Sequence, residues 1–103
     1  MEKSQGGALY LAISEHAITD IEDILIYSLQ NHGETTASRY IASLDTKLKS
    51  LLNNPTSGQN FNWLKQDVRR LTYKQYNIYY MLKADEIKIL RVLHQRQDPA
   101  DKL

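Results

Sequence analysis

The spacing of the apolar residues changes once along this chain of 103 residues, at about Asp67. Before Asp67 they recur every three or four residues, which is the spacing of one face of a helix. After Asp67 they alternate, which is the spacing of a strand with two different faces. A chain of this length is enough for one compact core, so we expect residues 1–103 to form a single domain in which helices pack on strands.

The first part of the chain predicts a strand that leads into a helix. Leu9–Ile13 is a short apolar run rich in strand formers. Ser14 is a good N-cap, and apolar residues at helical spacing continue from there to His32. Gly33 then offers a left-handed stop, so we expect the first helix to end at this point.

A second helix is predicted after a cap at Thr35 or Thr36, with an apolar stripe that runs until Asn54-Pro55 ends it. Only about three residues separate it from the first helix, which favours an antiparallel hairpin. A long connection over residues 53–67 follows. Three of its side chains are expected to tuck under the domain: Phe61, Trp63 and Leu64.

The last part of the chain predicts a three-stranded meander, with strands at Val68–Tyr73, Tyr76–Lys83 and Glu86–His94. Tight turns at Lys74-Gln75 and Ala84-Asp85 connect them. Both alternating sets of the third strand are mostly apolar, as in a central strand covered on two faces. The expected fold is α+β in the order β-α-α-β-β-β, an N-terminal strand and a helical hairpin packed on a mainly antiparallel sheet. Residues 1–7 and 97–103 are expected to be loose ends.

Composition excludes several kinds of site. There is no cysteine, no pair of histidines at metal-ligand spacing and no glycine-rich phosphate loop, so we expect neither a metal nor a cofactor. No apolar run approaches the length of a membrane span, so we expect no membrane contact and a cytoplasmic location. Residues 1–64 hold four Lys and Arg against seven Asp and Glu, whereas residues 65–103 hold nine against five. The C-terminal third is therefore a basic module.

The helices and strands also carry an ordered set of residues that a known family shares. The helical part reads HAITDIEDILIYSLQNHGETTASRYIASLDTKLKSLLNNPTSG, and the strand part contains YNIYY and IKILRVLHQRQD. Over about residues 9–98 this set resembles the RelE/ParE toxins, and its ending resembles the ParE branch in particular. The resemblance implies a toxin of a type II toxin-antitoxin system, held inactive in a hetero-oligomer by a cognate antitoxin. ParE members look like inhibitors of DNA gyrase, whereas RelE members are ribosome-dependent mRNA endonucleases of the same fold.

One position favours the gyrase inhibitor over the nuclease. RelE-like nucleases resemble one another in an arginine directly after the tyrosine that opens the penultimate strand, and here Tyr76 is followed by Asn77. An amide cannot supply the positive charge that RNA cleavage requires. We therefore expect a non-enzymatic inhibitor of gyrase. The alternative is a nuclease that cuts mRNA on the ribosome with Arg69, His94 and Arg96, and a third interpretation is a non-toxic relative that only binds.

Basic residues of the strand part are the candidates for target binding: Arg69, Arg70, Lys74, His94 and Arg96. Because strand residues alternate, one of Arg69 and Arg70 faces the helices and the other faces away. Both also fit the role of edge-strand charges, which discourage aggregation of sheets. Arg91 lies inside the predicted central strand, where we expect it to pair with a carboxylate of the acidic first helix.

Apolar and aromatic side chains are the candidates for antitoxin binding. We expect Ile78, Tyr80 and Leu82 to face the helices, which leaves Tyr79 and Met81 on an open face of the sheet. An open face of this kind calls for a protein partner. The full set of antitoxin-binding candidates is Tyr73, Tyr79, Met81, Ile21, Leu25, Leu44 and Leu48.

Overall fold

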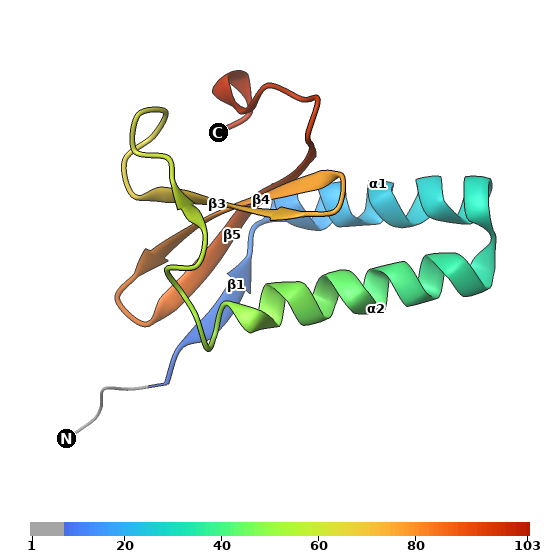
Figure 1. The fold of residues 1–103 in the computed structure, drawn as a ribbon, viewed down its shortest axis with the longest axis horizontal. Helices are drawn as coiled ribbons and strands as arrows, with labels where there is room; N and C mark the ends of the chain where they lie inside the picture. Colours follow the sequence, from blue (N-terminus) through green and yellow to red (C-terminus); the bar gives the residue numbers. More distant parts are fainter. Residues whose placement is uncertain (1–7) are drawn as a thin grey trace.

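The computed structural model describes residues 8–103, in which a hairpin of two helices packs on a five-stranded sheet (Figure 1). The strands are β1 (Tyr10–Ile13), β2 (Gln59–Asn60), β3 (Val68–Tyr73), β4 (Tyr76–Lys83) and β5 (Glu86–His94). The helices are α1 (Glu15–His32), α2 (Glu34–Ser50) and a short 3-10 helix, η2 (Pro99–Asp101). The predicted α+β fold is confirmed, with β2 as an additional strand. The prediction for residues 1–7 lies outside the described residues.

The sheet is mixed and has the strand order β1-β5-β4-β3-β2. β1 runs parallel to β5 and the other neighbours are antiparallel, so β5 is a central strand, as predicted. The predicted bounds of β3, β4 and β5 are confirmed, because the alternation stops at two tight turns. Lys74 has a φ of 54° and Ala84 a φ of 56°, left-handed values that allow these turns to reverse the chain.

The start of α1 is set by a local cap that also reaches the sheet. Ser14 Oγ accepts a hydrogen bond from the Ala17 amide at 3.1 Å, as expected of an N-cap. The same hydroxyl donates to the Leu90 carbonyl at 2.8 Å. The capping residue therefore ties the first turn of the helix to β5.

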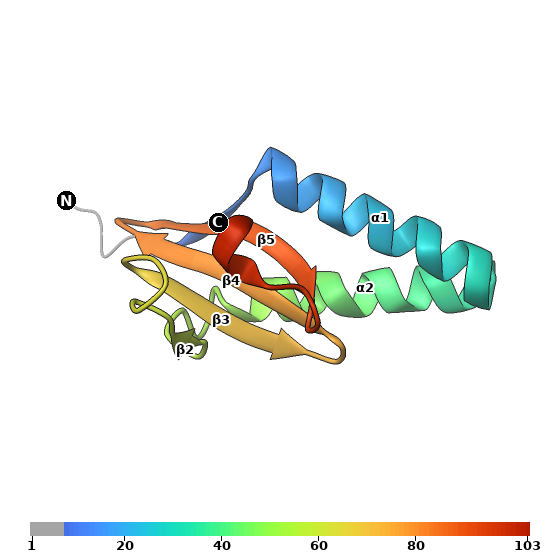
Figure 2. The ribbon, with the colours of Figure 1, turned by 90° about the horizontal axis from the view of Figure 1, so that it is seen from above.

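A single residue, Gly33, connects the two helices. It has a φ of 84° and a ψ of 171°, a combination that glycine adopts without steric cost. Its carbonyl accepts a hydrogen bond from the Ala37 amide at 3.0 Å, so α2 begins at Glu34. The predicted three-residue connection with a cap at Thr35 or Thr36 is wrong, because the glycine alone reverses the chain. Figures 1 and 2 show that the resulting hairpin extends beyond the sheet.

The main core lies between the helices and one face of the sheet. Ile78 and Tyr80 are fully buried there and Leu82 packs against them, as predicted. The helices contribute one apolar face each, since their buried residues recur at helical spacing. The buried apolar residues of the two helices are Ala17, Ile24, Ala37, Leu44 and Leu48.

A second, smaller core covers the other face of the sheet. Tyr79 is only 1% exposed, and its ring centroid lies 5.9 Å from that of Phe61. Met81 is half-buried in the same cluster. The prediction that Tyr79 and Met81 lie on an open face is therefore wrong, because side chains distant in sequence cover them. The covering residues include Phe61, Leu64 and Leu103.

The two segments that supply this cover differ from their predictions. Phe61 and Leu64 tuck under the domain as expected, but Trp63 is 75% exposed. The end of the chain, predicted to be loose, is ordered: Asp98 Oδ1 accepts a hydrogen bond from the Ala100 amide at 2.9 Å and caps η2. Leu103 then packs on the sheet. Local composition could not reveal this order, because it depends on an apolar surface elsewhere.

The hydroxyl of Tyr80 holds the loop between α2 and β2. It donates a hydrogen bond to the Pro55 carbonyl at 2.8 Å and accepts one from the Gly58 amide at 2.9 Å. Gly58 is buried, and a Cβ at this position would lie 2.7 Å from the Tyr80 ring and from its hydroxyl. The glycine is therefore required by the close approach of the loop to the core.

Replacing Gly58 with alanine is expected to lower the free energy of unfolding by about 1–3 kcal/mol, a typical cost of overpacking a core. The Tyr80 ring cannot move away without breaking both hydrogen bonds of its hydroxyl. Urea unfolding followed by circular dichroism measures the change. Ser57→Ala, at the exposed neighbouring position, is the control and is expected to change stability by less than about 0.5 kcal/mol. Equal stability of the two variants would contradict this role of Gly58.

Candidate functional site

An ion pair between α1 and β5 shapes the region where the candidate site lies. Arg91 donates from Nε to Asp20 Oδ2 and from Nη2 to Asp20 Oδ1, both at 2.8 Å. The side chains are only 18% and 11% exposed. These charge-assisted hydrogen bonds raise the pKa of the Arg91 guanidinium, although burial opposes the shift. The prediction that Arg91 pairs with a carboxylate of the first helix is confirmed.

The same carboxylate also closes an edge of the sheet. β1 pairs with β5 only as far as Ile13 and Ile89, so the rest of β5 has no neighbouring strand on that side. Asp20 Oδ2 accepts a hydrogen bond from the Val92 amide at 2.9 Å, which satisfies this edge. A register shift between Tyr79 and Tyr80 accompanies this region of the β4–β5 pair.

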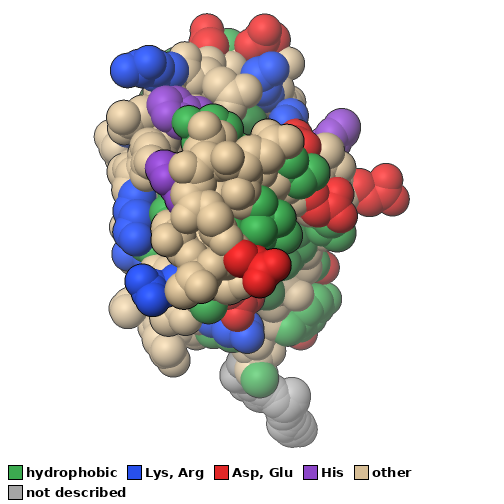
Figure 3. All heavy atoms as spheres, turned by 90° about the vertical axis from the view of Figure 1, so that its right-hand side faces the viewer, with side chains coloured by type: hydrophobic (Ala, Val, Ile, Leu, Met, Phe, Trp, Pro, Cys, Tyr) green, Lys and Arg blue, Asp and Glu red, His purple; other side chains and the backbone are tan. Residues whose placement is uncertain are grey.

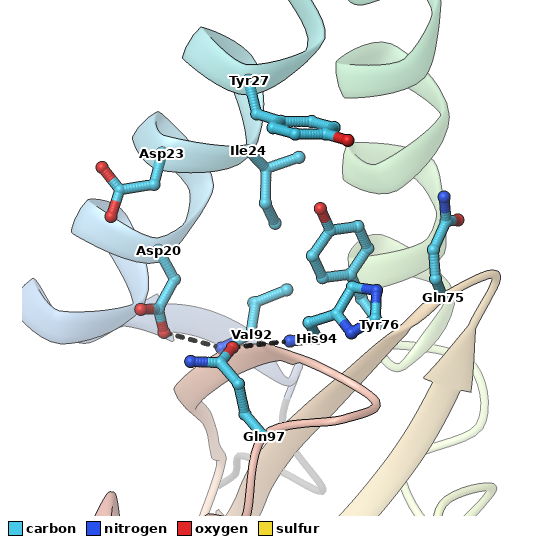
Figure 4. A pocket seen from close by; sticks show the side chains of 9 residues that line it. All are labelled: Asp20, Asp23, Ile24, Tyr27, Gln75, Tyr76, Val92, His94 and Gln97. Atoms are coloured by element: carbon cyan, nitrogen blue, oxygen red, sulfur yellow. Dashed lines mark hydrogen bonds between the residues drawn. The ribbon is translucent and has the colours of Figure 1, made fainter.

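A pocket of the described chain opens between α1 and the end of β5 (Figure 4). It has a volume of about 480 Å³, within the range of ligand-binding pockets. Ile24 and Val92 give it an apolar wall, while Tyr27 and Tyr76 contribute aromatic rings. The complete lining is Asp20, Asp23, Ile24, Tyr27, Gln75, Tyr76, Val92, His94 and Gln97.

His94 is held in this pocket by neighbours on both sides. Its ring meets that of Tyr76 edge to face, with 5.5 Å between centroids. Nδ1 accepts a hydrogen bond from the Arg96 amide at 3.2 Å, and the His94 amide donates to Gln97 Oε1 at 2.9 Å.

A smaller hollow of about 270 Å³ adjoins the pocket and shares Tyr27, Gln75 and Tyr76 with it. Tyr40 lines this hollow, and its buried hydroxyl has no hydrogen-bond partner within residues 8–103. Burial raises the pKa of Tyr40 to about 12, so the phenol stays neutral. The ammonium of Lys74 lies 5.0 Å from the centre of the Tyr40 ring. The hollow is therefore basic where the larger pocket is acidic.

The candidates for target binding fall into two groups. Lys74 lies in the β3–β4 turn, and His94 and Arg96 lie at the end of β5. The Gln95 amide donates to the Gln75 carbonyl at 2.8 Å, so these two turns are joined at one end of the sheet. Arg69 lies four residues before the strand end that faces His94, which is about 13 Å along the strand.

Arg69 and Arg70 are both engaged within the chain. Arg69 Nη1 donates to the Gly58 carbonyl at 2.8 Å, on the face of the helices. Arg70 Nη2 donates to Gln59 Oε1 at 2.9 Å, and its guanidinium lies 4.6 Å from the centre of the Phe61 ring. The predicted division of the two arginines between the faces is confirmed. Because Arg69 is held about 13 Å along the strand from the end that faces His94, Arg69, His94 and Arg96 do not converge on one point, as a nuclease site would require.

Asn77 lies on the face opposite the pocket. Its backbone pairs with Leu93, a residue of the second core, and its side chain is 7% exposed. Asn77 Oδ1 accepts a hydrogen bond from the Thr72 hydroxyl at 2.9 Å. The residue therefore supplies a buried polar contact, and its side chain is a neutral amide instead of a positively charged group.

Three of the antitoxin-binding candidates have no surface to offer. Tyr79 and Leu44 are 1% exposed and Leu48 is 2% exposed, because their side chains belong to the cores. Ile21, Leu25, Tyr73 and Met81 are half-buried and keep some accessible surface. Some pocket residues were not predicted as site residues, because three separate segments of the chain supply them: Asp23, Tyr27, Tyr76 and Gln97.

α1 exposes more apolar surface than its sequence pattern suggested. Ile18 is 45% exposed, Ile26 51% and Leu29 41%. Ile18, Leu25 and Leu29 share one side of the helix because they are spaced by seven and four residues. Several exposed apolar residues on one side of a helix are typical of a protein-binding site.

Two other classes of site find no support in residues 8–103. No helix in this range is long and apolar enough to cross a membrane. Within the same range, His, Cys, Asp and Glu side chains form no group of three or more that could hold a metal ion.

Comparisons with known proteins agree on one family. Residues 11–99 match the sequence model described as ParE toxin of type II toxin-antitoxin system, parDE. Toxin ParE1 of Caulobacter vibrioides is 30% identical over 83 residues, which cover 81% of this chain and 85% of that protein. A solved structure, described as the chromosomal ParDE TA system from P. aeruginosa, has the same fold with a TM-score of 0.75 at 22% identity. The match covers 84% of this chain and 96% of that one.

Replacing Asp20 with asparagine is expected to lower the free energy of unfolding by about 3 kcal/mol, because a partly buried Arg91 is left without its counter-ion. Urea unfolding measures this change. The control is Asp45→Asn, which breaks an ion pair with Lys49 of the same length, 2.8 Å, but on the surface. Its expected cost is below about 0.5 kcal/mol. Similar losses of unfolding free energy in both variants would contradict a stabilising role of the ion pair between Asp20 and Arg91.

Tyr40→Phe tests the buried hydroxyl. At pH 7 the variant is expected to be at least as stable as the wild type, because it removes a hydroxyl with no partner within residues 8–103. The pKa of Tyr40 is about 12 in the fold against an ordinary value of 10.0, so the unfolded chain ionises first and the wild type loses stability from pH 10 to 12.

The variant lacks this loss, so its unfolding free energy should fall less steeply over that range than the wild type's. Urea unfolding at several pH values provides the measurement. Tyr27→Phe, at a tyrosine that is 57% exposed, is the control and should follow the wild type. A Tyr40→Phe curve with the wild-type slope would argue against a buried, neutral phenol.

Proposed function

This chain belongs to the ParE toxin family of type II toxin-antitoxin systems, and from that premise we propose that it stops growth by binding DNA gyrase, without catalysing a reaction of its own. We further propose that a cognate antitoxin neutralises it in a hetero-oligomer. The family match over residues 11–99 is the observation that carries this proposal.

The placement of the cations supports binding over RNA cleavage. A nuclease needs an acid, a base and a positive charge within hydrogen-bond reach of one phosphate. Arg69 is held by the Gly58 carbonyl, about 13 Å along the sheet from His94. Asn77 lies on the opposite face and is neutral. This separation within residues 8–103 supports the gyrase inhibitor over the alternative, a ribosome-dependent mRNA endonuclease.

The gyrase-binding surface is proposed to lie at the end of the sheet where the two turns meet. Lys74 and Arg96 are exposed there, and the hydrogen bond from Gln95 to Gln75 fixes the turns relative to each other. On the face drawn in Figure 3, most Lys and Arg side chains lie to the left and most Asp and Glu side chains lie at the centre and right, although both kinds meet at the top and bottom. Such separated charges orient a protein as it approaches its partner and raise the rate of association.

The antitoxin is proposed to cover the exposed side of α1. Ile18, Ile26 and Leu29 each expose more than two fifths of their surface, and Leu25 lies among them. Burying this surface in a partner is favourable, whereas leaving it in water promotes non-specific association. Of the antitoxin-binding candidates, Leu25 and Ile21 are the ones that this surface includes.

Purified toxin is expected to reduce supercoiling by gyrase and to increase the amount of cleaved DNA that gyrase retains. Translation reactions with ribosomes and a defined mRNA, supplied with the same sample, should show no new cleavage of the transcript. Unchanged gyrase activity together with growth arrest on expression would refute the proposed target. Transcript cleavage on ribosomes would instead support the nuclease, and the absence of growth arrest would support a relative that only binds.

The proposed surface is tested with paired variants. Lys74→Ala combined with Arg96→Ala should raise the toxin concentration needed for half-maximal gyrase inhibition by about tenfold, since charges at the rim of an interface affect association. Lys83→Ala combined with Lys88→Ala removes two exposed charges at the opposite part of the sheet and should leave it unchanged. Equal effects of the two pairs would place the contact elsewhere.

A further inference from the structure

The pocket between α1 and β5 carries one carboxylate whose charge is not neutralised. Asp20 is occupied by the guanidinium of Arg91 and by the amide of Val92. Asp23 follows one turn later on the same helix, is exposed, and makes no ion pair or hydrogen bond within residues 8–103. No lysine or arginine of the described chain lines the pocket. A cation from outside would therefore meet an attractive potential.

The walls of the pocket suit the remaining parts of a long cationic side chain. The rings of Tyr27 and Tyr76 stand on either side of Ile24 in Figure 4, and His94 packs against Tyr76. Aromatic faces attract cations, and the apolar surface of Ile24 and Val92 can take up a methylene stem. The volume of about 480 Å³ leaves room for a large side chain.

We propose that this pocket receives an arginine side chain of the antitoxin, with the guanidinium bound by Asp23 at the rim and the stem packed beside the aromatic rings of the pocket. Arginine fits better than lysine, because its planar group pairs with a carboxylate through two hydrogen bonds and stacks on aromatic rings. The inference rests on the partnership with an antitoxin proposed above.

Two observations identify the antitoxin, rather than gyrase, as the source of the arginine. Lys74 and Arg96, which flank the pocket region, suit an acidic target surface, so a basic side chain comes from a different partner. The exposed side of α1 also continues directly to the pocket: Ile26 and Tyr27 are consecutive, and they are 51% and 57% exposed. An antitoxin segment that covers Ile26 therefore lies next to the rim of the pocket.

Seating this arginine also explains how the antitoxin neutralises the toxin. The pocket shares Gln75 and Tyr76 with the hollow that Lys74 lines, and the Arg96 amide is bonded to His94 in its wall. A chain anchored in the pocket therefore lies beside both cations of the proposed gyrase-binding surface. Gyrase and antitoxin would compete for the same end of the sheet.

The test uses the full-length toxin and the antitoxin encoded by the adjacent gene. Their dissociation constant is measured for wild-type toxin and for Asp23→Asn and Asp85→Asn. Each variant removes one exposed carboxylate by the same change, but Asp85 lies in the β4–β5 turn, away from the pocket and from the exposed side of α1. Asp23→Asn is expected to weaken binding by about tenfold or more, and Asp85→Asn by less than about twofold. Thermal unfolding of each variant confirms that it is folded.

A second arm identifies the antitoxin side chain. Each arginine and lysine of the antitoxin is changed to alanine, and each change is combined with Asp23→Asn in a double-mutant cycle. For one antitoxin arginine, the change to alanine is expected to weaken binding to wild-type toxin but to have almost no effect on binding to the Asp23→Asn variant. The toxin variant Tyr27→Leu should also weaken antitoxin binding, and this loss should depend on the presence of the same arginine.

The outcomes separate the inference from the proposal on which it rests. Equal affinities of wild type and Asp23→Asn, equal losses in Asp23→Asn and Asp85→Asn, or coupling of Asp23 to a lysine would each overturn the arginine site. If wild-type toxin does not bind the antitoxin, the partnership and the site fall together. The gyrase assay on free toxin is independent of both.

Discussion

The carboxylate of Asp20 is the contact on which the arrangement of helix and sheet depends. β5 is nine residues long, but β1 pairs with only four of them, which leaves about half of the strand without a neighbour on the side opposite β4. Asp20 accepts the Val92 amide and both arms of the Arg91 guanidinium, and Ser14 donates to the Leu90 carbonyl. Two residues of one helix segment thus replace the missing strand and prevent pairing with another chain at this edge.

This solution also creates the pocket. Because Asp20 holds α1 close to β5, the next turn of the helix stands over the end of the strand. Tyr27 then lies over Tyr76, and Asp23 lines the rim of the pocket. Neutralising Asp20 with Arg91 leaves Asp23 as the charge available to a partner. The same interaction therefore serves stability and, in our proposal, recognition.

Much of the fold could be predicted from the sequence because its signals are local. The alternation in β3, β4 and β5 and the cap at Ser14 act within a few residues, and each was placed correctly. The start of α2 was misplaced, because the geometry of Gly33 depends on how the two helices pack. Trp63 and residues 97–103 were misjudged for a related reason: their burial depends on surfaces formed by other strands.

The sequence by itself determined the family, the order of the elements and the separation of acidic and basic halves, since these are properties of spacing and composition. Only the tertiary structure decided which charges are free and which tyrosines are buried. Asp20 and Arg91 are 71 residues apart, and Tyr79 is covered by Phe61 from a loop. Such contacts have no local signature, because the energy of a buried charge or ring depends on neighbours that only the folded chain brings together.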